Sequence, residues 1–266
     1  MKRLAVIALV AAFVVPLAWA VIASLTPESQ LFGGARVVPT ELVLDHYRAL
    51  FQERDFWAPV RNSIVVAATT TAVCLALGAP CAYALARIRF PGRGAVLGFV
   101  LAVGMFPQIT LVSPLYLALR AVGLIDTVPG LVLPYLTFAL PITVWLLTTY
   151  FRERPAEIEE AARVDGASRL DVLLRVVLPL AAPGLATTAI LTFIYAWNEL
   201  LFALAFTVQP DRRTVPVAIA LFRGQYQIPW GQILAATIVA TAPIALLVLA
   251  FQRRIVRGLT GGALKG

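Results

Sequence analysis

The chain has 266 residues, of which 60% are hydrophobic and only 14% are charged, and its formal net charge is +8. A soluble domain carries roughly 25% charged residues, so this composition excludes an ordinary soluble protein. The apolar residues form long blocks, and about 18 or more of them in a row match a helix that crosses a bilayer. We therefore expect an all-α integral membrane protein.

Six apolar blocks are long enough to form transmembrane helices. They cover approximately residues 4–25, 62–86, 95–119, 131–150, 184–208 and 231–251. Several contain prolines, including Pro80, Pro107 and Pro141. Membrane helices tolerate proline because neighbouring helices satisfy the carbonyl groups that it leaves free. The sequence predicts six spans in a single transmembrane domain, residues 1–266.

The first block has two interpretations. Lys2 and Arg3, an apolar run and the small residues Ala18 and Ala20 are also typical of a cleaved secretory signal peptide. The run is long enough to span a bilayer, however, and five remaining spans would leave the two ends of the chain on opposite sides. An uncleaved first helix is therefore the expectation.

Basic residues are unevenly shared between the two sides of the predicted bundle. Of the 22 lysines and arginines, 14 fall on the side of the N-terminus: Lys2, Arg3, Arg87, Arg89, Arg93, Arg152, Arg154, Arg163, Arg169, Arg175, Arg253, Arg254, Arg257 and Lys265. Loops rich in Lys and Arg stay cytoplasmic, so both termini are expected in the cytoplasm of a bacterial cell. The positive charge then reports topology in the cell membrane, and no nucleic-acid partner is expected.

Groups that enzymes need are scarce in this sequence. His46 is the only histidine, and it falls in the first outside loop, 26–59, where we expect it to be exposed. A catalytic triad would need that histidine beside a nucleophile. The only lysines, Lys2 and Lys265, lie outside any P-loop, and metal-ligand spacings are missing. We expect no catalytic, metal or cofactor site here, so any ATP and Mg²⁺ would bind a partner ATPase.

The longest inside loop, residues 152–180, reads as two short helices. Pro155 suits the first position of the first helix, whose early glutamates lie near the positive end of the helix dipole. Gly166 is placed to end that helix in a left-handed conformation. Ser168 and Asp171 have the spacing of a capping box and predict the start of the second helix.

One face of the first short helix suits close contact with another surface. The residues that recur on this face at helical spacing are Ile158, Ala161, Ala162 and Asp165. The two alanines leave little bulk, so a second surface could approach the backbone. An amphipathic helix lying on lipid headgroups would show the same pattern. A DNA-binding helix-turn-helix is disfavoured because the flanking spans tie the loop to the membrane.

The same loop resembles the EAA signature of binding-protein-dependent ABC permeases. The matching residues are Glu160, Ala161, Ala162, Asp165, Gly166, Ala167, Val176, Leu178, Pro179 and Pro183. The resemblance implies a type I (MetI-like) importer permease, in which residues 152–180, between spans four and five, dock in a cleft of a cytoplasmic ATPase. We call these residues the coupling segment. Leu173 departs from the pattern, which commonly has an aromatic residue there, but it keeps the apolar character.

Further stretches resemble carbohydrate-uptake permeases of the maltose type. They are residues 62–63, 82–87, 105–107, 114–116, 123–127, 197–199 and 257–262. The resemblance implies ATP-driven import of a mono- or oligosaccharide by a six-span subunit. It also implies a homologous second permease, two cytoplasmic ATPase subunits and an extracytoplasmic solute-binding protein, received by the outside segments 26–59 and 209–230.

Other functions fit part of the sequence. A permease of the same architecture could carry a different solute, such as a polyol or a glycerol phosphate. A secondary transporter driven by an ion gradient would also have six spans, but it gives the EAA signature no role. A membrane-embedded enzyme is disfavoured by the scarcity of catalytic groups.

Glu199 is the only acidic residue within a predicted span. An ionisable group at membrane depth is costly and usually faces a polar cavity or a partner. Tyr195, Trp197, Asn198 and Glu199, with Gln108 on the third span, are therefore candidates for a pathway where sugar hydroxyls meet polar and aromatic groups. The alternative is that Asn198 and Glu199 satisfy helix backbones or pair across a subunit interface.

Overall fold

The computed structural model describes residues 2–31, 39–222 and 228–260, and within these ranges every regular element is a helix. The all-α prediction is confirmed for this part of the chain. Four described helices are each long and apolar enough to cross a membrane: α1 (Lys2–Ser24), α4 (Trp57–Arg87), α7 (Val128–Arg152) and α14 (Trp230–Thr260). Arg36, Arg223, Lys265 and residues 261–262 of the maltose-type tail lie outside the described residues.

Two further crossings require bent pairs of helices, which gives up to six spans in the described residues. In the first pair, α5 (Arg93–Gly104) meets α6 (Gln108–Ala121) at 85°. In the second, the helical stretch Arg169–Leu180 meets α11 (Ala182–Asn198) at 82°. The steep second bend turns the end of the coupling segment away from the direction of α11.

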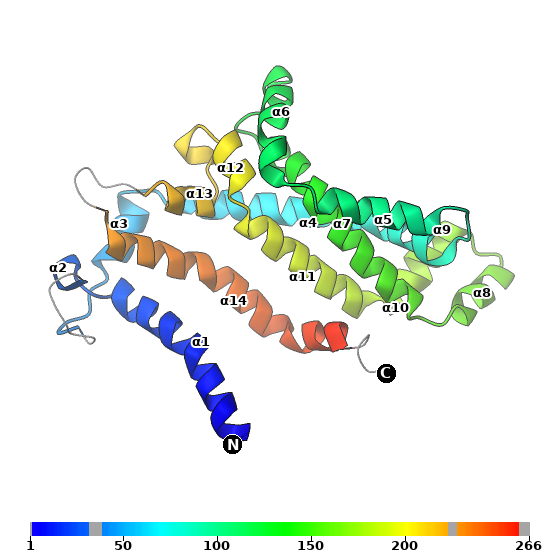
Figure 1. Cartoon of the computed structure of the whole chain (residues 1–266), viewed down its shortest axis with the longest axis horizontal. Coiled ribbons are helices and arrows are strands. Elements are labelled where there is room, and N and C mark those ends of the chain that lie inside the picture. Colours follow the sequence, from blue (N-terminus) through cyan, green and yellow to red (C-terminus); the bar gives the residue numbers. More distant parts are fainter. Residues whose placement is uncertain (1, 32–38, 223–227, 261–266) are drawn as a thin grey trace.

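Pro107 explains why the third apolar block is not one straight helix. It lacks an N–H and disfavours helical backbone at Phe106, so α5 ends before it and α6 begins after it. In Figure 1, α6 stands out from the rest of the bundle. By contrast α4 continues through Pro80 and α7 through Pro141, as expected of membrane helices.

The helices α4, α7 and α11 form the centre of the bundle (Figure 1). α14 packs against α11, α1 lies along α14, and α5 lies along α7. One cluster of buried apolar side chains includes Phe56, Tyr135 and Phe202, and a second includes Leu147 and Leu173. The second cluster joins the coupling segment to α4 and α7.

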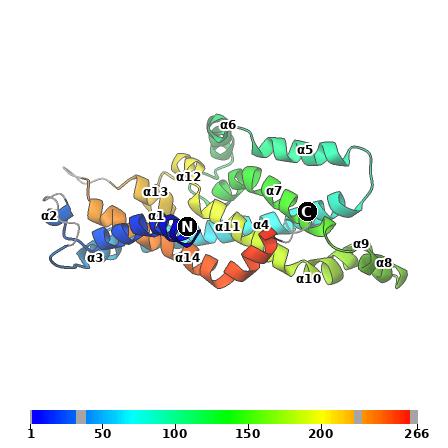
Figure 2. The same ribbon diagram turned by 60° about the horizontal axis from the view of Figure 1, so that its bottom comes forward.

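The short helices gather at the two ends of the bundle (Figures 1 and 2). One end carries α2 (Glu28–Leu31), α3 (Asp45–Gln52) and α13 (Val215–Ala220). The other carries α8 (Glu157–Val164), α9 (Arg169–Asp171), a π-helical turn (Val172–Val177) and α10 (Leu178–Leu180). We call these the loop end and the coupling end.

Candidate functional site

The first EAA-like residues, Glu160, Ala161 and Ala162, lie on the short helix α8, which stops sharply at the coupling end. Gly166 follows α8 with φ of 88°, and Ser168 Oγ accepts a hydrogen bond from the Asp171 N–H at 3.2 Å to start α9. The predicted left-handed glycine and the predicted cap are both confirmed. The Ser168 hydroxyl also donates a hydrogen bond to the Asp171 carboxylate, which lowers the pKa of Asp171.

The predicted start of this helix is wrong by two residues. Pro155 was expected at the first helical position, but α8 begins at Glu157. The Ala156 carbonyl accepts hydrogen bonds from the N–H groups of Glu159 and Glu160, both at 3.0 Å, so Ala156 precedes the first turn. Pro155 therefore lies just outside the helix.

The coupling segment presents an exposed surface of mixed chemistry. Its large exposed apolar side chains are Ile158, Val164, Leu170, Leu174 and Leu180, and Val164 is 88% exposed. The signature residues Glu160, Ala161, Asp165 and Gly166 are exposed beside them. Ala162 and Ala167 instead pack against the apolar cluster beneath. On the face expected from helical spacing, Ala162 is thus only partly exposed, whereas Val164, which the spacing did not include, is exposed; the role of this face in docking stays a prediction.

The inner side of α8 carries a charge pair that sequence reasoning missed. Glu159 Oε1 accepts a hydrogen bond from Arg87 Nε at 2.7 Å, and the two side chains are 8% and 16% exposed. The sequence indicated only that Glu159 favours the dipole of its own helix. The two residues are 72 positions apart, and neither local spacing nor periodicity could pair them.

The pathway candidates come together where α11 ends. Gln108 Nε2 donates a hydrogen bond to the Tyr195 hydroxyl at 2.9 Å and so links α6 to α11. Trp197 is buried and stacks on Phe193, whereas Asn198 is exposed and donates to the carbonyl of Ile194 in its own helix. A pathway role for these residues stays a prediction.

Glu199 lies at a break in the fifth apolar block. Its backbone is extended, and the short helix α12 (Leu201–Phe206) follows it. The Glu199 carboxylate is buried and accepts hydrogen bonds from the N–H groups of Phe202 at 2.9 Å and Ala203 at 3.1 Å. The side chain therefore satisfies the free backbone donors that begin a helix.

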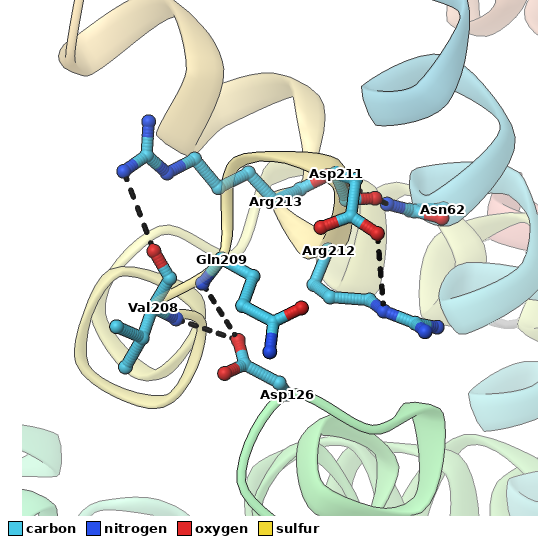
Figure 3. A network of polar contacts seen from close by, with 7 residues as sticks. All are labelled: Asn62, Asp126, Val208, Gln209, Asp211, Arg212 and Arg213. Carbon is cyan, nitrogen blue, oxygen red and sulfur yellow. Dashed lines mark hydrogen bonds and ion pairs between the residues drawn. The ribbon is translucent and has the colours of Figure 1, made fainter.

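At the loop end, Asp126 holds the chain that leaves α12 (Figure 3). Its Oδ1 accepts hydrogen bonds from the N–H groups of Val208 at 2.6 Å and Gln209 at 3.1 Å, and its own N–H donates to the carbonyl of Phe206 at 3.1 Å. Asp126 adopts a φ of 61°, which aspartate tolerates better than most residues. The loop before α7 is thereby tied to the segment after α12.

The start of α4 holds the next part of the same segment. Asn62 Nδ2 donates hydrogen bonds to the carbonyls of Asp211 at 2.7 Å and Arg213 at 3.0 Å (Figure 3). Ser63 Oγ accepts one from the Val215 N–H at 2.8 Å. Asn62 and Ser63 belong to a stretch that resembles maltose-type permeases. The structure shows that both hold the segment after α12 in place.

The first loop is bound to the start of α14 and contains a buried histidine. His46 is 8% exposed and its Nε2 donates to the carbonyl of Thr26 at 2.8 Å, so the expectation of an exposed histidine is wrong. A side chain at Gly231 would overlap the His46 ring. The Glu28 carboxylate accepts hydrogen bonds from the N–H groups of Trp230 and Gly231, each at 3.1 Å.

A comparison with protein families identifies the chain. The family described as "Binding-protein-dependent transport system inner membrane component" matches residues 74–261, well over half of its length. The chain belongs to this permease family. The resemblance drawn from the EAA residues is thus confirmed, and the protein is a multi-pass membrane permease.

Curated relatives resemble this permease over nearly its whole length. It is 48% identical over 253 residues to the trehalose transport system permease protein SugB of Mycobacterium tuberculosis, covering 94% of this chain and 92% of the relative. It is 41% identical over 254 residues to the trehalose/maltose permease MalG of Thermococcus litoralis, covering 94% and 91%. These relatives are named as permease proteins, so the chain is a transport subunit.

A solved structure has the same fold. The permease superposes with a TM-score of 0.80 and 22% identity on a chain from a bacterial ABC transporter that imports the acidic polysaccharide alginate, covering 95% of this chain and 94% of that one. The type I importer fold expected from the signature is confirmed. Among residues 2–31, 39–222 and 228–260 of the permease, no three His, Cys, Asp or Glu side chains are grouped to hold a metal ion.

Gly166 offers a direct test of the sharp stop after α8. A β-branched residue is strained at φ of 88°, whereas asparagine adopts the left-handed conformation more readily. A Cβ at this position would meet open space, so backbone strain and not a clash is tested. We expect Gly166→Val to lower uptake about five- to thirtyfold and Gly166→Asn to stay within about threefold of wild type, because the strain costs roughly 1–2 kcal/mol. Equal uptake by the two variants would contradict this reading.

Proposed function

We propose that this permease is one of two membrane subunits of an ATP-driven ABC importer that takes up a mono- or oligosaccharide. The observation that carries the proposal is the exposed α8 surface at one end of the bundle, with Val164 and Asp165 pointing away from the rest of the chain. An exposed patch of apolar side chains rimmed by polar ones is typical of a protein interface. The trehalose and trehalose/maltose relatives support a sugar as the solute.

The proposed partners follow from this arrangement. Two ATPase subunits bind ATP and Mg²⁺ and receive the coupling segments of this permease and of a homologous second permease. An extracytoplasmic binding protein delivers the solute to the loop end. A second fold neighbour, with a TM-score of 0.70 and 16% identity over 94% of this chain and 91% of that one, comes from an alginate transporter in complex with a pentasaccharide-bound periplasmic protein, which supports such a partner.

The segments of the loop end are held in place by hydrogen bonds, so they need not rearrange when a protein binds there. Asp126 and Asn62 hold the segment 207–213 at several backbone positions, and Glu28 holds the first loop to α14. A surface that is already ordered loses less conformational entropy when it binds a partner. We propose that the described parts of segments 26–59 and 209–230 form this docking surface.

The proposed topology places the coupling end and both termini in the cytoplasm, with α1 retained as an uncleaved helix. Arg87, Arg89, Arg93 and Arg152 lie near the coupling end, as the positive-inside rule requires. In the proposed cycle, the ATPases close on ATP, bring the coupling segments together and open the pathway towards the loaded binding protein. Hydrolysis then restores the inward-facing state.

Reconstitution tests this function. The permease is purified together with the second permease and the ATPase subunits encoded by neighbouring genes. The complex is placed in vesicles with the binding protein on one side and ATP on the other. ATP-dependent uptake of labelled trehalose or maltose is the expected result. Uptake driven by an ion gradient, without an ATPase, would support a secondary transporter and sink the proposal.

A second solute class has one supporting observation. The permease is 38% identical over 252 residues to the sulfoquinovosyl glycerol permease SmoH of Agrobacterium fabrum, covering 94% of this chain and 88% of the relative. A glycerol-linked solute should therefore be tested beside trehalose and maltose in the uptake experiment. Thermal stabilisation of the purified binding protein by each compound decides between the two classes.

A further inference from the structure

The coupling segment is joined to the membrane bundle in two different ways. Val172, Leu173 and Val177 are buried in the apolar cluster with α4 and α7, so the second half of the segment is held by packing. In α8 the apolar residues Ile158 and Val164 point outward, and the helix packs mainly on the 172–177 turn. Ala162 is the one α8 side chain that packs against the cluster, so a polar contact is needed to hold α8 firmly to the spanning helices.

Arg87, the last residue of α4, makes that contact. Its Nε donates to the Glu159 carboxylate at 2.7 Å, and its Nη2 donates to the carbonyl of Arg154 at 2.9 Å. One guanidinium thus joins the end of α4, the first turn of α8 and the connection that follows α7. Arg152 Nη2 also donates to the carbonyl of Leu85 at 3.4 Å and ties the end of α7 to α4.

The geometry and burial of this pair distinguish it from the other ion pair described in the coupling segment, Asp171–Arg175. A charge-assisted hydrogen bond of this length is about twice as strong as a neutral one. With 8% and 16% of their side chains exposed, Glu159 and Arg87 are shielded from the water that weakens surface pairs. The Asp171–Arg175 pair, at 3.5 Å with side chains 41% and 81% exposed, has no such protection.

We propose that Arg87 and Glu159 are positioning residues for energy coupling, which make α8 and α4 move as one body. The inference rests on the proposed function, because it assumes that an ATPase pushes on the outer face of α8. That push would reach the second half of the segment by packing and α4 through the ion pair. Without the pair, α8 can turn under load while α4 stays behind.

The pair lies on the side of α8 opposite to the exposed docking residues, so docking and coupling can be separated by mutation. Arg87→Glu and Glu159→Arg should each leave the ATPase bound but lower its stimulation by the loaded binding protein at least tenfold. The double variant Arg87→Glu with Glu159→Arg should recover most of the stimulation. Arg89→Glu, at an exposed position two residues beyond Arg87 and outside the coupling segment, is the matched charge-reversal control and should stay near wild type.

The experiment uses the full transporter in vesicles and measures three quantities: ATPase subunits bound, ATPase rate with and without loaded binding protein, and solute carried per ATP. Single variants with wild-type stimulation, or a double variant no better than the singles, would overturn the inference. Should a charge reversal prevent assembly, Glu159→Gln decides the question, because it keeps the shape and the acceptor oxygen. A fall in solute carried per ATP for Glu159→Gln supports the pair, and an unchanged ratio overturns it.

A distance measurement separates positioning from simple stability. Spin labels at Arg89, just after α4, and at Ala156, just before α8, should give one narrow distance that does not change between nucleotide states. In Glu159→Gln the distance should broaden when ATP binds. Wild-type protein that never binds an ATPase would instead reject the proposed function, and a narrow distance in the variant would reject only the present inference.

Discussion

Alanine at Gly130 should prevent the loop before α7 from keeping its native path. The added Cβ would overlap the carbonyl oxygen of Leu124, and a backbone atom cannot rotate away as a side chain would. Thr127 Oγ1 donates to that same carbonyl at 2.7 Å and accepts from the Gly130 N–H at 3.1 Å, so both hydrogen bonds would be distorted. We expect a loss of about 3 kcal/mol in the free energy of unfolding.

The damage at Gly130 should spread to the loop end, because Asp126 lies in the displaced loop and holds Val208 and Gln209. Gly98→Ala is the matched control: it adds the same methyl group within α5, where a Cβ meets open space. The readouts are the thermal unfolding temperature in detergent and the yield of monodisperse protein. Similar unfolding temperatures for the two variants would show that the Leu124 carbonyl can move at little cost.

Removal of the Glu199 carboxylate should give the second large effect. In Glu199→Ala the N–H groups of Phe202 and Ala203 lose their acceptor in a buried setting. Each of the two orphaned donors costs about 1–3 kcal/mol, so we expect a loss of roughly 2–6 kcal/mol. Glu199→Gln keeps one oxygen acceptor and should lose about half as much.

The same variants decide between the two interpretations of Glu199. If its role is to cap α12, stability and uptake should fall together in Glu199→Ala and recover together in Glu199→Gln. A Glu199→Gln protein that is stable and hydrolyses ATP normally, yet loses uptake, would establish the pathway role instead. Leu204→Ala is the neighbouring control, because the Leu204 side chain is exposed on the same short helix and lies outside the pathway candidates.

Much of this fold could be predicted because bilayer-length apolar blocks are a strong and local signal. The four continuous helices α1, α4, α7 and α14 each overlap an apolar block recognised in the sequence. Local chemistry also placed Gly166 at a left-handed stop and Ser168 at a cap, since both depend on residues close in sequence. The third block was harder, because Pro107 interrupts its helix whereas Pro80 and Pro141 do not interrupt theirs.

The contacts that could not be predicted join residues far apart in sequence. Glu159 and Arg87 are 72 positions apart, and Asn62 and Asp211 are 149 apart. Each of these charged or polar groups had an adequate local explanation, as a dipole residue or as a motif match. The burial of His46 was missed for the same reason, because its partner at Thr26 and the facing Gly231 are set by tertiary packing.

The hydrogen bonds from Glu28 to the start of α14 have a consequence for biosynthesis. Glu28 leaves the ribosome early, whereas its donors Trp230 and Gly231 are made about two hundred residues later. Contacts between such distant parts of a chain form slowly. The first loop therefore reaches its final position only after the last helix has been made, and a chain truncated before Trp230 lacks the two hydrogen bonds that hold this loop.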